Sequence, residues 1–127
     1  MEDNRDNHPL DLSYLTEMVG DDPEFIIEIF ETFIEQTPFY MAELEDTLLV
    51  KDWKKLANCA HKIKPTFSYV GRNDVKDSVQ FIETCARNEQ NIEIIPKKVE
   101  ELHQILDEIY VQLDRTIAEV KTKFNMV

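Results

Sequence analysis

The sequence of 127 residues is poor in glycine, in cysteine and in long apolar runs, and each shortage excludes a class of protein. With only two glycines it has no glycine-rich loop that could cradle the phosphates of ATP. Its two cysteines, Cys59 and Cys85, are too few for a disulfide framework, so we expect small buried residues in a reducing compartment. No apolar stretch approaches the ~20 residues that span a bilayer, and MEDNRDNHP lacks the features of a signal peptide. We therefore expect a cytoplasmic protein that does not bind membranes.

Positive charge is also scarce, since 14 lysines and arginines face 26 aspartates and glutamates, for a formal net charge of -12. This balance argues against nucleic-acid binding, which needs cations clustered over a wide face. Apolar residues make up 43% of the chain and no low-complexity run interrupts them, which indicates a globular domain. We predict a single helical domain over residues 10–127, preceded by a flexible N-terminal tail of residues 1–9.

Helical spacing of apolar residues runs through the domain, and no segment alternates as a half-buried strand does, so we predict an all-α fold. A short helix should begin near Asp11 and end at Gly20. Four long helices should follow: from residue 23, after Asp22 as N-cap; from 53 to 71; from about 73 to the polar loop RNEQN; and from about 95 to 124. Pro38 should kink the first long helix.

Each long helix carries one apolar stripe. The expected stripes are Ile26, Phe30, Phe33, Thr37, Met41, Leu44 and Leu48; Trp53, Leu56, Ala60, Ile63, Phe67 and Val70; Val75, Val79, Ile82 and Ala86; and Val99, Leu102, Leu106, Ile109, Leu113, Ile117 and Val120. Short connections between such helices predict an antiparallel up-down four-helix bundle, with the short first helix capping one end. Because each helix has a single stripe, we expect a monomer.

One histidine lies among cations in the segment AHKIKPTFSYVG, residues 60–71. Five lysines and one aspartate lie between residues 51 and 64 of this otherwise acidic chain. On a helical wheel His61 lies roughly 130° from the centre of the apolar stripe, so it should face water. A neutral ring nitrogen with a lysine three residues on suits a phosphoryl acceptor, although a histidine on a solvated basic face has the same pattern. The wheel places these residues around His61: Lys54, Ala57, Asn58, Lys64, Pro65, Ser68 and Arg72.

The run HKIKPTFSYVG resembles the signature of the histidine-containing phosphotransfer (HPt) domain. That signature is a histidine, an aliphatic residue, a lysine, usually a glycine, a small hydroxyl residue and a closing aliphatic-glycine pair. In this chain the places are taken by His61, Ile63, Lys64, Pro65, Thr66, Val70 and Gly71. The upstream segments GDDPEF, ETFIEQTP and DW are also similar to the family and stand in the same order. The resemblance covers residues 12–120.

The resemblance implies a phosphorelay intermediate of two-component signalling, which takes a phosphoryl group from a receiver-domain aspartate and passes it to another receiver domain. His61 would be the phosphoacceptor, Lys64 would neutralise the phosphoryl oxygens, and Thr66 and Gly71 would support the motif. Such a protein is not an enzyme and has no kinase activity of its own. It has no cofactor or metal, because the partner receiver supplies Mg²⁺.

The implied partners are the receiver domains of response regulators, together with that of a hybrid histidine kinase. We expect the basic strip beside His61 to suit the acidic rim of such a receiver in a transient complex. The predicted partner-binding residues are Lys54, Ala57, Asn58, Lys62, Pro65, Ser68 and Arg72.

One position departs from the family pattern, because Pro65 stands where glycine is usual. Proline has no N–H to donate to the carbonyl of His61 and its ring crowds that carbonyl, which costs about 3 kcal/mol in a regular helix. We expect the helix either to bend at His61 or to leave that carbonyl to water. We also hypothesise that Pro65 belongs to the receiver contact surface.

Two other functions remain open. The chain could bind receivers without accepting phosphate, an alternative suggested by Pro65, or it could be a structural helical adaptor. We expect no functional role for the other two histidines, His8 and His103. A zinc site formed by Cys59 and His61 is excluded, because residues two apart on a helix diverge by about 200°.

Overall fold

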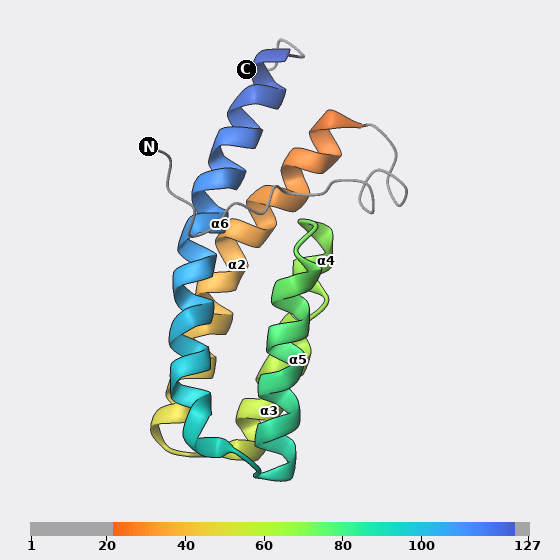
Figure 1. Ribbon diagram of the computed structural model, residues 1–127. Helices are drawn as coiled ribbons and strands as arrows, with labels where there is room; N and C mark the ends of the chain where they lie inside the picture. The colour runs from red at the N-terminus through yellow and green to blue at the C-terminus, as the bar shows by residue number, and fades with distance from the viewer. Residues whose placement is uncertain (1–21, 124–127) are drawn as a thin grey trace, which may run out of the picture.

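The computed structural model describes residues 22–123, which contain helices and turns and no strand (Figure 1). The predicted all-α class is therefore confirmed for this part of the chain. The elements are α2 (Pro23–Leu49), α3 (Trp53–Ile63), α4 (Thr66–Tyr69), α5 (Asn73–Asn88), a 3₁₀ turn η1 (Ile92–Ile94) and α6 (Ile95–Lys123). The predicted tail and the predicted helix of residues 11–20 lie outside the described residues.

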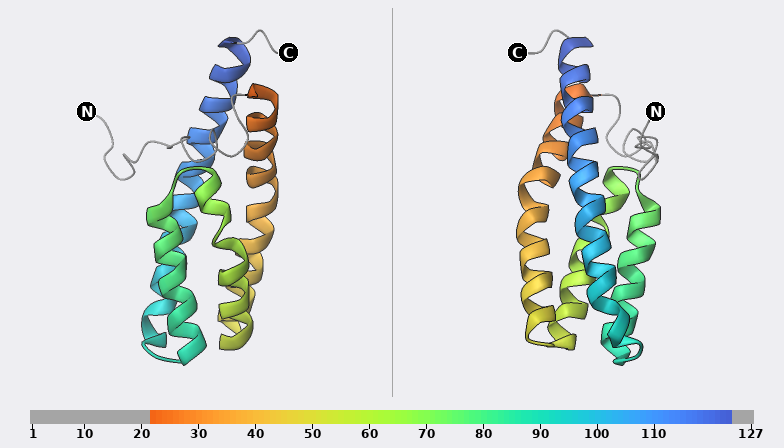
Figure 2. Two further views of the ribbon diagram at one scale, coloured as in Figure 1. Left: turned by 90° about the vertical axis from the view of Figure 1, so that its right-hand side faces the viewer. Right: turned by 60° about the vertical axis from the view of Figure 1, so that its left-hand side comes forward.

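The long helices form a bundle in which each packs against two neighbours. Helix α2 contacts α3 and α6, and α5 contacts the same two helices from the other side. Figure 2 shows α4 above the end of α3, beside the upper part of α5. The site described below lies where α3 meets α5.

Helix α2 begins as its sequence predicts. The carboxylate of Asp22 accepts hydrogen bonds from the backbone N–H groups of Glu24 and Phe25, at 3.0 and 3.3 Å, and Pro23 occupies the first position. The helix continues without interruption through Pro38 to Leu49. Its buried stripe differs from the prediction only at the ends, where Ile27 and Thr47 are buried and the expected Ile26 and Leu48 are partly buried.

Helices α5 and α6 bury the predicted residues. The whole expected stripe of α5 is buried, together with Glu83 and Cys85, and so is that of α6 except for the partly buried Val120. Both cysteines are buried, as expected. Burial is the main cause that raises the pKa of the Cys59 thiol to about 11, so this thiol stays protonated at neutral pH.

The predicted helix from residue 53 to 71 is wrong, because it is divided in two at Lys64 and Pro65. Without an N–H, Pro65 cannot continue the α-helical hydrogen bonds, and the chain passes into three-residue turns. In these turns the Phe67 N–H donates to the Lys64 carbonyl at 3.3 Å, and the Ser68 N–H donates to the Pro65 carbonyl at 3.1 Å. Helix α3 therefore ends two residues after His61, and Lys64 is its C-terminal cap.

Helix α4 is short, but the buried side chain of Phe67 holds it on the core, and a turn at Gly71 follows it. The side chain of Phe67 is fully buried, and its ring meets that of Phe33 edge-on at 5.9 Å. Burying such a side chain contributes about 1.5–3 kcal/mol, which holds the segment after the break on the core. Gly71 then ends the segment as predicted, with a left-handed φ of 72° that costs a glycine little.

Candidate functional site

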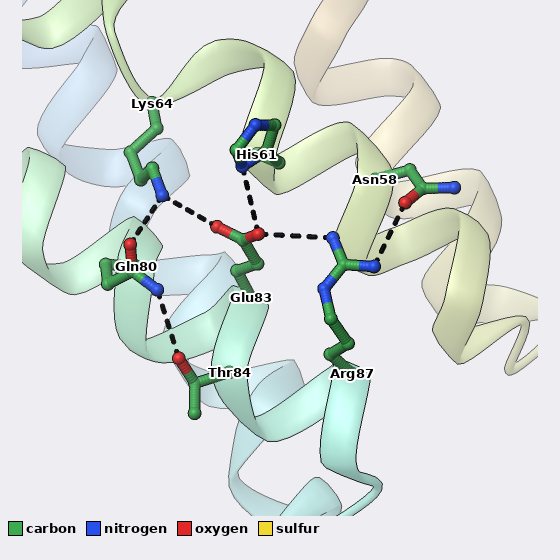
Figure 3. Close-up of polar contacts among 7 residues, drawn as sticks. All are labelled: Asn58, His61, Lys64, Gln80, Glu83, Thr84 and Arg87. Carbon is green, nitrogen blue, oxygen red and sulfur yellow. Dashed lines mark hydrogen bonds and ion pairs between the residues drawn. The ribbon is translucent and has the colours of Figure 1, made fainter.

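His61 lies near the C-terminal end of α3 and faces water, as predicted, with its side chain 66% exposed. Its ring is nevertheless held in place, because Nδ1 lies 3.0 Å from Oε2 of Glu83 on α5 (Figure 3). The other ring nitrogen, Nε2, has no hydrogen bond among the described residues. The packing of α3 on α5 thus fixes one nitrogen and leaves the other for a partner.

The carboxylate of Glu83 is the centre of the site. Its side chain is only 9% exposed, yet it accepts from Lys64 Nζ at 2.9 Å and from Arg87 Nη2 at 3.1 Å, as well as facing His61. Burial alone would raise the pKa of Glu83, but the hydrogen bonds from Lys64 and Arg87, helped by the charges of Lys64 and His61, hold it below its ordinary value. Glu83 is therefore an ionised acceptor at neutral pH.

The charge of Glu83 fixes the tautomer of His61. An ionised carboxylate has no proton to donate, so the 3.0 Å contact requires Nδ1 to carry the hydrogen. In the neutral ring, Nε2 then holds the lone pair. The outward nitrogen is thus the nucleophilic one.

The ammonium group of Lys64 is also held on α5. It donates to Oε1 of Glu83 and to the side-chain oxygen of Gln80, and its side chain is 15% exposed. Gln80 is oriented in turn by donating to Thr84 Oγ1 at 3.1 Å. His61 and Lys64, three residues apart on one helix, therefore converge on a single carboxylate (Figure 3).

Arg87 completes the site from the C-terminal end of α5. One of its nitrogens holds Glu83, four residues earlier, and Nη1 donates to Oδ1 of Asn58 on α3 at 3.3 Å. The guanidinium thus bridges the same two helices as His61 does.

Several predicted partner-binding residues lie on the surface around His61. Lys54, Asn58, Lys62 and Pro65 are exposed, and Ser68 is partly exposed. They do not form one free strip. Lys62 turns toward α2, where it pairs with Glu43 at 3.0 Å and lies over the ring of Tyr40.

Two of the predicted partner-binding residues are buried, so their expected exposure was wrong. Ala57 is fully buried, because α2 and α5 cover α3 from two sides and bury a wider arc than one stripe. Arg72 is 2% exposed and holds Asp74 through Nε and Nη2, each at 3.0 Å. The wheel assumed an unbroken helix, and the break at Pro65 followed by the turn at Gly71 carries Arg72 inward.

The other motif residues lie on α4 and at its end. Thr66 is partly buried and lines an apolar groove of about 440 Å³ between α2 and α4, together with Phe25, Ile29 and Tyr69. Gly71 forms the turn already described.

Sequence reasoning missed Gln80, Glu83 and Arg87. A signal for Glu83 was present, because a helical wheel puts it about 40° from Val79 and about 60° from Ala86, just beyond the edge of the apolar arc of its helix. A carboxylate that becomes buried there needs cations close to it. The lysine of the HKIK run and Arg87, four residues on, are suitable donors.

Residues 22–123 hold no group of three or more histidine, cysteine, aspartate or glutamate side chains placed to bind a metal ion. Within the same residues, no helix combines the length and the apolar character that crossing a membrane requires.

A family model of the Hpt domain matches residues 28–112, well over half of the chain. The chain therefore belongs to the Hpt-domain family, as the HKIKPTFSYVG motif predicted. Domains of this family carry phosphoryl groups on histidine in two-component signalling and are not kinases. No curated protein and no solved structure matches the chain.

Proposed function

We propose that this chain accepts a phosphoryl group on Nε2 of His61 from the aspartate of one receiver domain and passes it to the aspartate of another. The observation that carries the proposal is the pairing of Nδ1 with the buried, ionised Glu83, at 3.0 Å, in a ring that is otherwise 66% exposed. This arrangement presents Nε2 outward with its lone pair free.

In the transfer, the Nε2 lone pair forms a bond to phosphorus while the bond from phosphorus to the aspartyl oxygen breaks. The electron pair of the broken bond leaves with that oxygen, which becomes a carboxylate. Nδ1 keeps its hydrogen on Glu83, so the phosphorylated ring is a cation beside an anion. In the onward step the ring leaves as a neutral imidazole, which is a far better leaving group than an imidazolate.

The protein's part in such a transfer is to position groups and to neutralise charge. Lys64, the residue that caps α3, already lies close to the imidazole, because its ammonium and the His61 ring contact the same carboxylate of Glu83. Its ammonium would neutralise the oxygens of the phosphoryl group. The partner receiver would supply Mg²⁺, which shields the same oxygens, and this chain would bring no cofactor of its own.

The partners we propose are receiver domains of response regulators, including that of a hybrid histidine kinase. The chain would act stoichiometrically in the cytoplasm, as a monomer. The contact surface around His61 would include Lys54, Asn58 and Pro65, all exposed, but not the buried Ala57 and Arg72.

Pro65 offers a rigid apolar patch one turn from the imidazole, where it would touch an approaching receiver. Pro65→Gly should change the transfer rate with at least one receiver by a few-fold, about 1 kcal/mol or less. Pro96, exposed in the first turn of α6, provides the matched control, and Pro96→Gly should leave the rate unchanged. If Pro65→Gly leaves the rate unchanged for every receiver tested, Pro65 is not part of the contact surface.

The central experiment mixes the protein with receivers charged by labelled acetyl phosphate and follows the label onto wild type, His61→Gln and His103→Gln. Label that is acid-labile and base-stable should appear on wild type and His103→Gln and be absent from His61→Gln. Receiver binding without label would favour a binding module instead, and neither binding nor label would favour a structural adaptor.

A further inference from the structure

The three partners of Glu83 are divided between its two oxygens. Lys64 holds Oε1 at 2.9 Å, whereas His61 and Arg87 share Oε2, at 3.0 and 3.1 Å. Lys64 comes from the end of α3, and Arg87 comes from α5 itself, one turn beyond Glu83. The two cations thus hold the carboxylate independently of each other (Figure 3).

The proposed function places a conflicting demand on Lys64. Its ammonium is occupied by Glu83 and Gln80, yet the phosphoryl group on His61 would need it. Withdrawing a cation from a carboxylate that is 9% exposed is costly unless other donors remain, because a buried charge must stay paired. Loading His61 is therefore favoured if Glu83 keeps a second cation beside the phosphorylated ring.

We propose that Arg87 is a positioning residue that releases Lys64 to the phosphoryl group. Arg87 keeps Oε2 of Glu83 paired together with the Nδ1 hydrogen, so Lys64 can turn from Oε1 to the phosphoryl oxygens. The inference rests on the proposed function, and Arg87 acts through Glu83 without touching phosphate.

The geometry assigns the fixed role to Arg87 and the moving role to Lys64. The guanidinium is held at two points, on Glu83 and on Asn58 of the facing helix, and its planar fork suits such a double contact. Lys64 has a flexible stem and three rotatable donors, and its ammonium lies on the same carboxylate as the His61 ring. It can turn outward by a change of rotamer that gives up its hydrogen bonds to Glu83 and Gln80.

The test measures the equilibrium between the phosphorylated receiver and phosphorylated His61 in the full chain. Arg87→Gln should shift this equilibrium about tenfold toward the receiver, since only in the loaded state, after Lys64 has turned away, does the loss of Arg87 leave Glu83 with neither side-chain cation. Arg87→Lys should restore most of the loading. Arg115, exposed on α6, gives the matched control, and Arg115→Gln should leave the equilibrium unchanged.

A double-mutant cycle separates this role from a general loss of structure. In a Lys64→Gln chain there is no ammonium to release, so adding Arg87→Gln should change the equilibrium by less than about twofold. Circular dichroism measures the folded fraction of each variant. The ratio of phosphorylated chain to phosphorylated receiver is then calculated for the folded protein alone.

Two results would overturn the inference: an equilibrium for Arg87→Gln equal to that of Arg115→Gln, or the same tenfold effect of Arg87→Gln with and without Lys64. Neither result would contradict the proposed function. That function is contradicted by a different observation, the absence of label from the wild type in the acetyl phosphate experiment.

Discussion

The molecule contains two histidine-glutamate pairs with nearly the same contact distance. His61 Nδ1 lies 3.0 Å from Glu83 between α3 and α5, and His103 Nδ1 lies 2.8 Å from Glu45 between α6 and α2. Both histidines are at least half exposed. By distance alone the two pairs are equivalent.

The pairs differ in what surrounds the carboxylate. Glu83 is 9% exposed and held by Lys64 and Arg87, whereas Glu45 is 43% exposed and has His103 as its one described ion-pair partner. The charge of the Asp107 carboxylate also acts on His103, where it helps to raise the pKa of the imidazole, and it would repel a phosphoryl group. The comparison teaches that burial and additional cations, and not the pair itself, distinguish the candidate site.

The largest expected difference between the pairs is in stability. Glu83→Ala should lower the free energy of unfolding by about 2 kcal/mol, because it leaves Lys64 and Arg87 without their buried anion. Glu45→Ala, which opens an exposed pair, should cost less than about 0.5 kcal/mol. Urea unfolding at pH 7 measures both.

The pH dependence of the Glu83 effect has a definite sign. Because the folded-state pKa of Glu83 lies below its ordinary 4.5, its contribution is present above that value and is lost as the pH falls through the folded pKa. The difference between wild type and Glu83→Ala should therefore shrink in strong acid. Equal costs for the Glu83 and Glu45 substitutions at pH 7 would remove the distinction between the two pairs.

The contribution of the pair between His103 and Glu45 to stability should be smaller, and it should change with pH in the opposite direction. The hydrogen bond to Glu45 raises the pKa of His103 above its ordinary 6.5, against the effect of burial. Its contribution is complete below 6.5 and is lost as the pH rises through the raised folded value. Between pH 6 and pH 9 the free energy of unfolding of the wild type should fall by about 0.3 kcal/mol relative to that of His103→Gln. Added salt should reduce this difference. A difference that does not change with pH would contradict this assignment.

Most of the helical framework could be predicted from the sequence. The stripes of α5 and α6 follow from apolar spacing because both helices run unbroken along one core. The start of α2 follows from Asp22 and Pro23, whose chemistry is local to the chain. His61 and Lys64 were predicted as site residues from the helical wheel, the lysines around them and the motif, all of which are local to the chain.

The missing parts depend on contacts between helices. The wheel could not place Arg72, because Pro65 and Gly71 change the direction of the chain before it. Ala57 lies off the stripe of α3 and is buried by a second neighbour that one helix does not reveal. Glu83 was missed for the same reason, since its burial and its pairing with Lys64 depend on the packing of α3 on α5, which the sequence of α5 does not reveal.

The site is assembled from distant parts of the chain. His61 and Glu83 are 22 positions apart, and Asn58 and Arg87 are 29 apart. Until α3 has packed on α5, a newly synthesised or locally opened chain carries the histidine without its carboxylate, with either ring nitrogen free to hold the proton. Such a chain would be a poor phosphoryl sink. Under the proposed function, the ability to accept a phosphoryl group would thus depend on completion of the fold, and incompletely folded copies would take little phosphoryl group from the receivers.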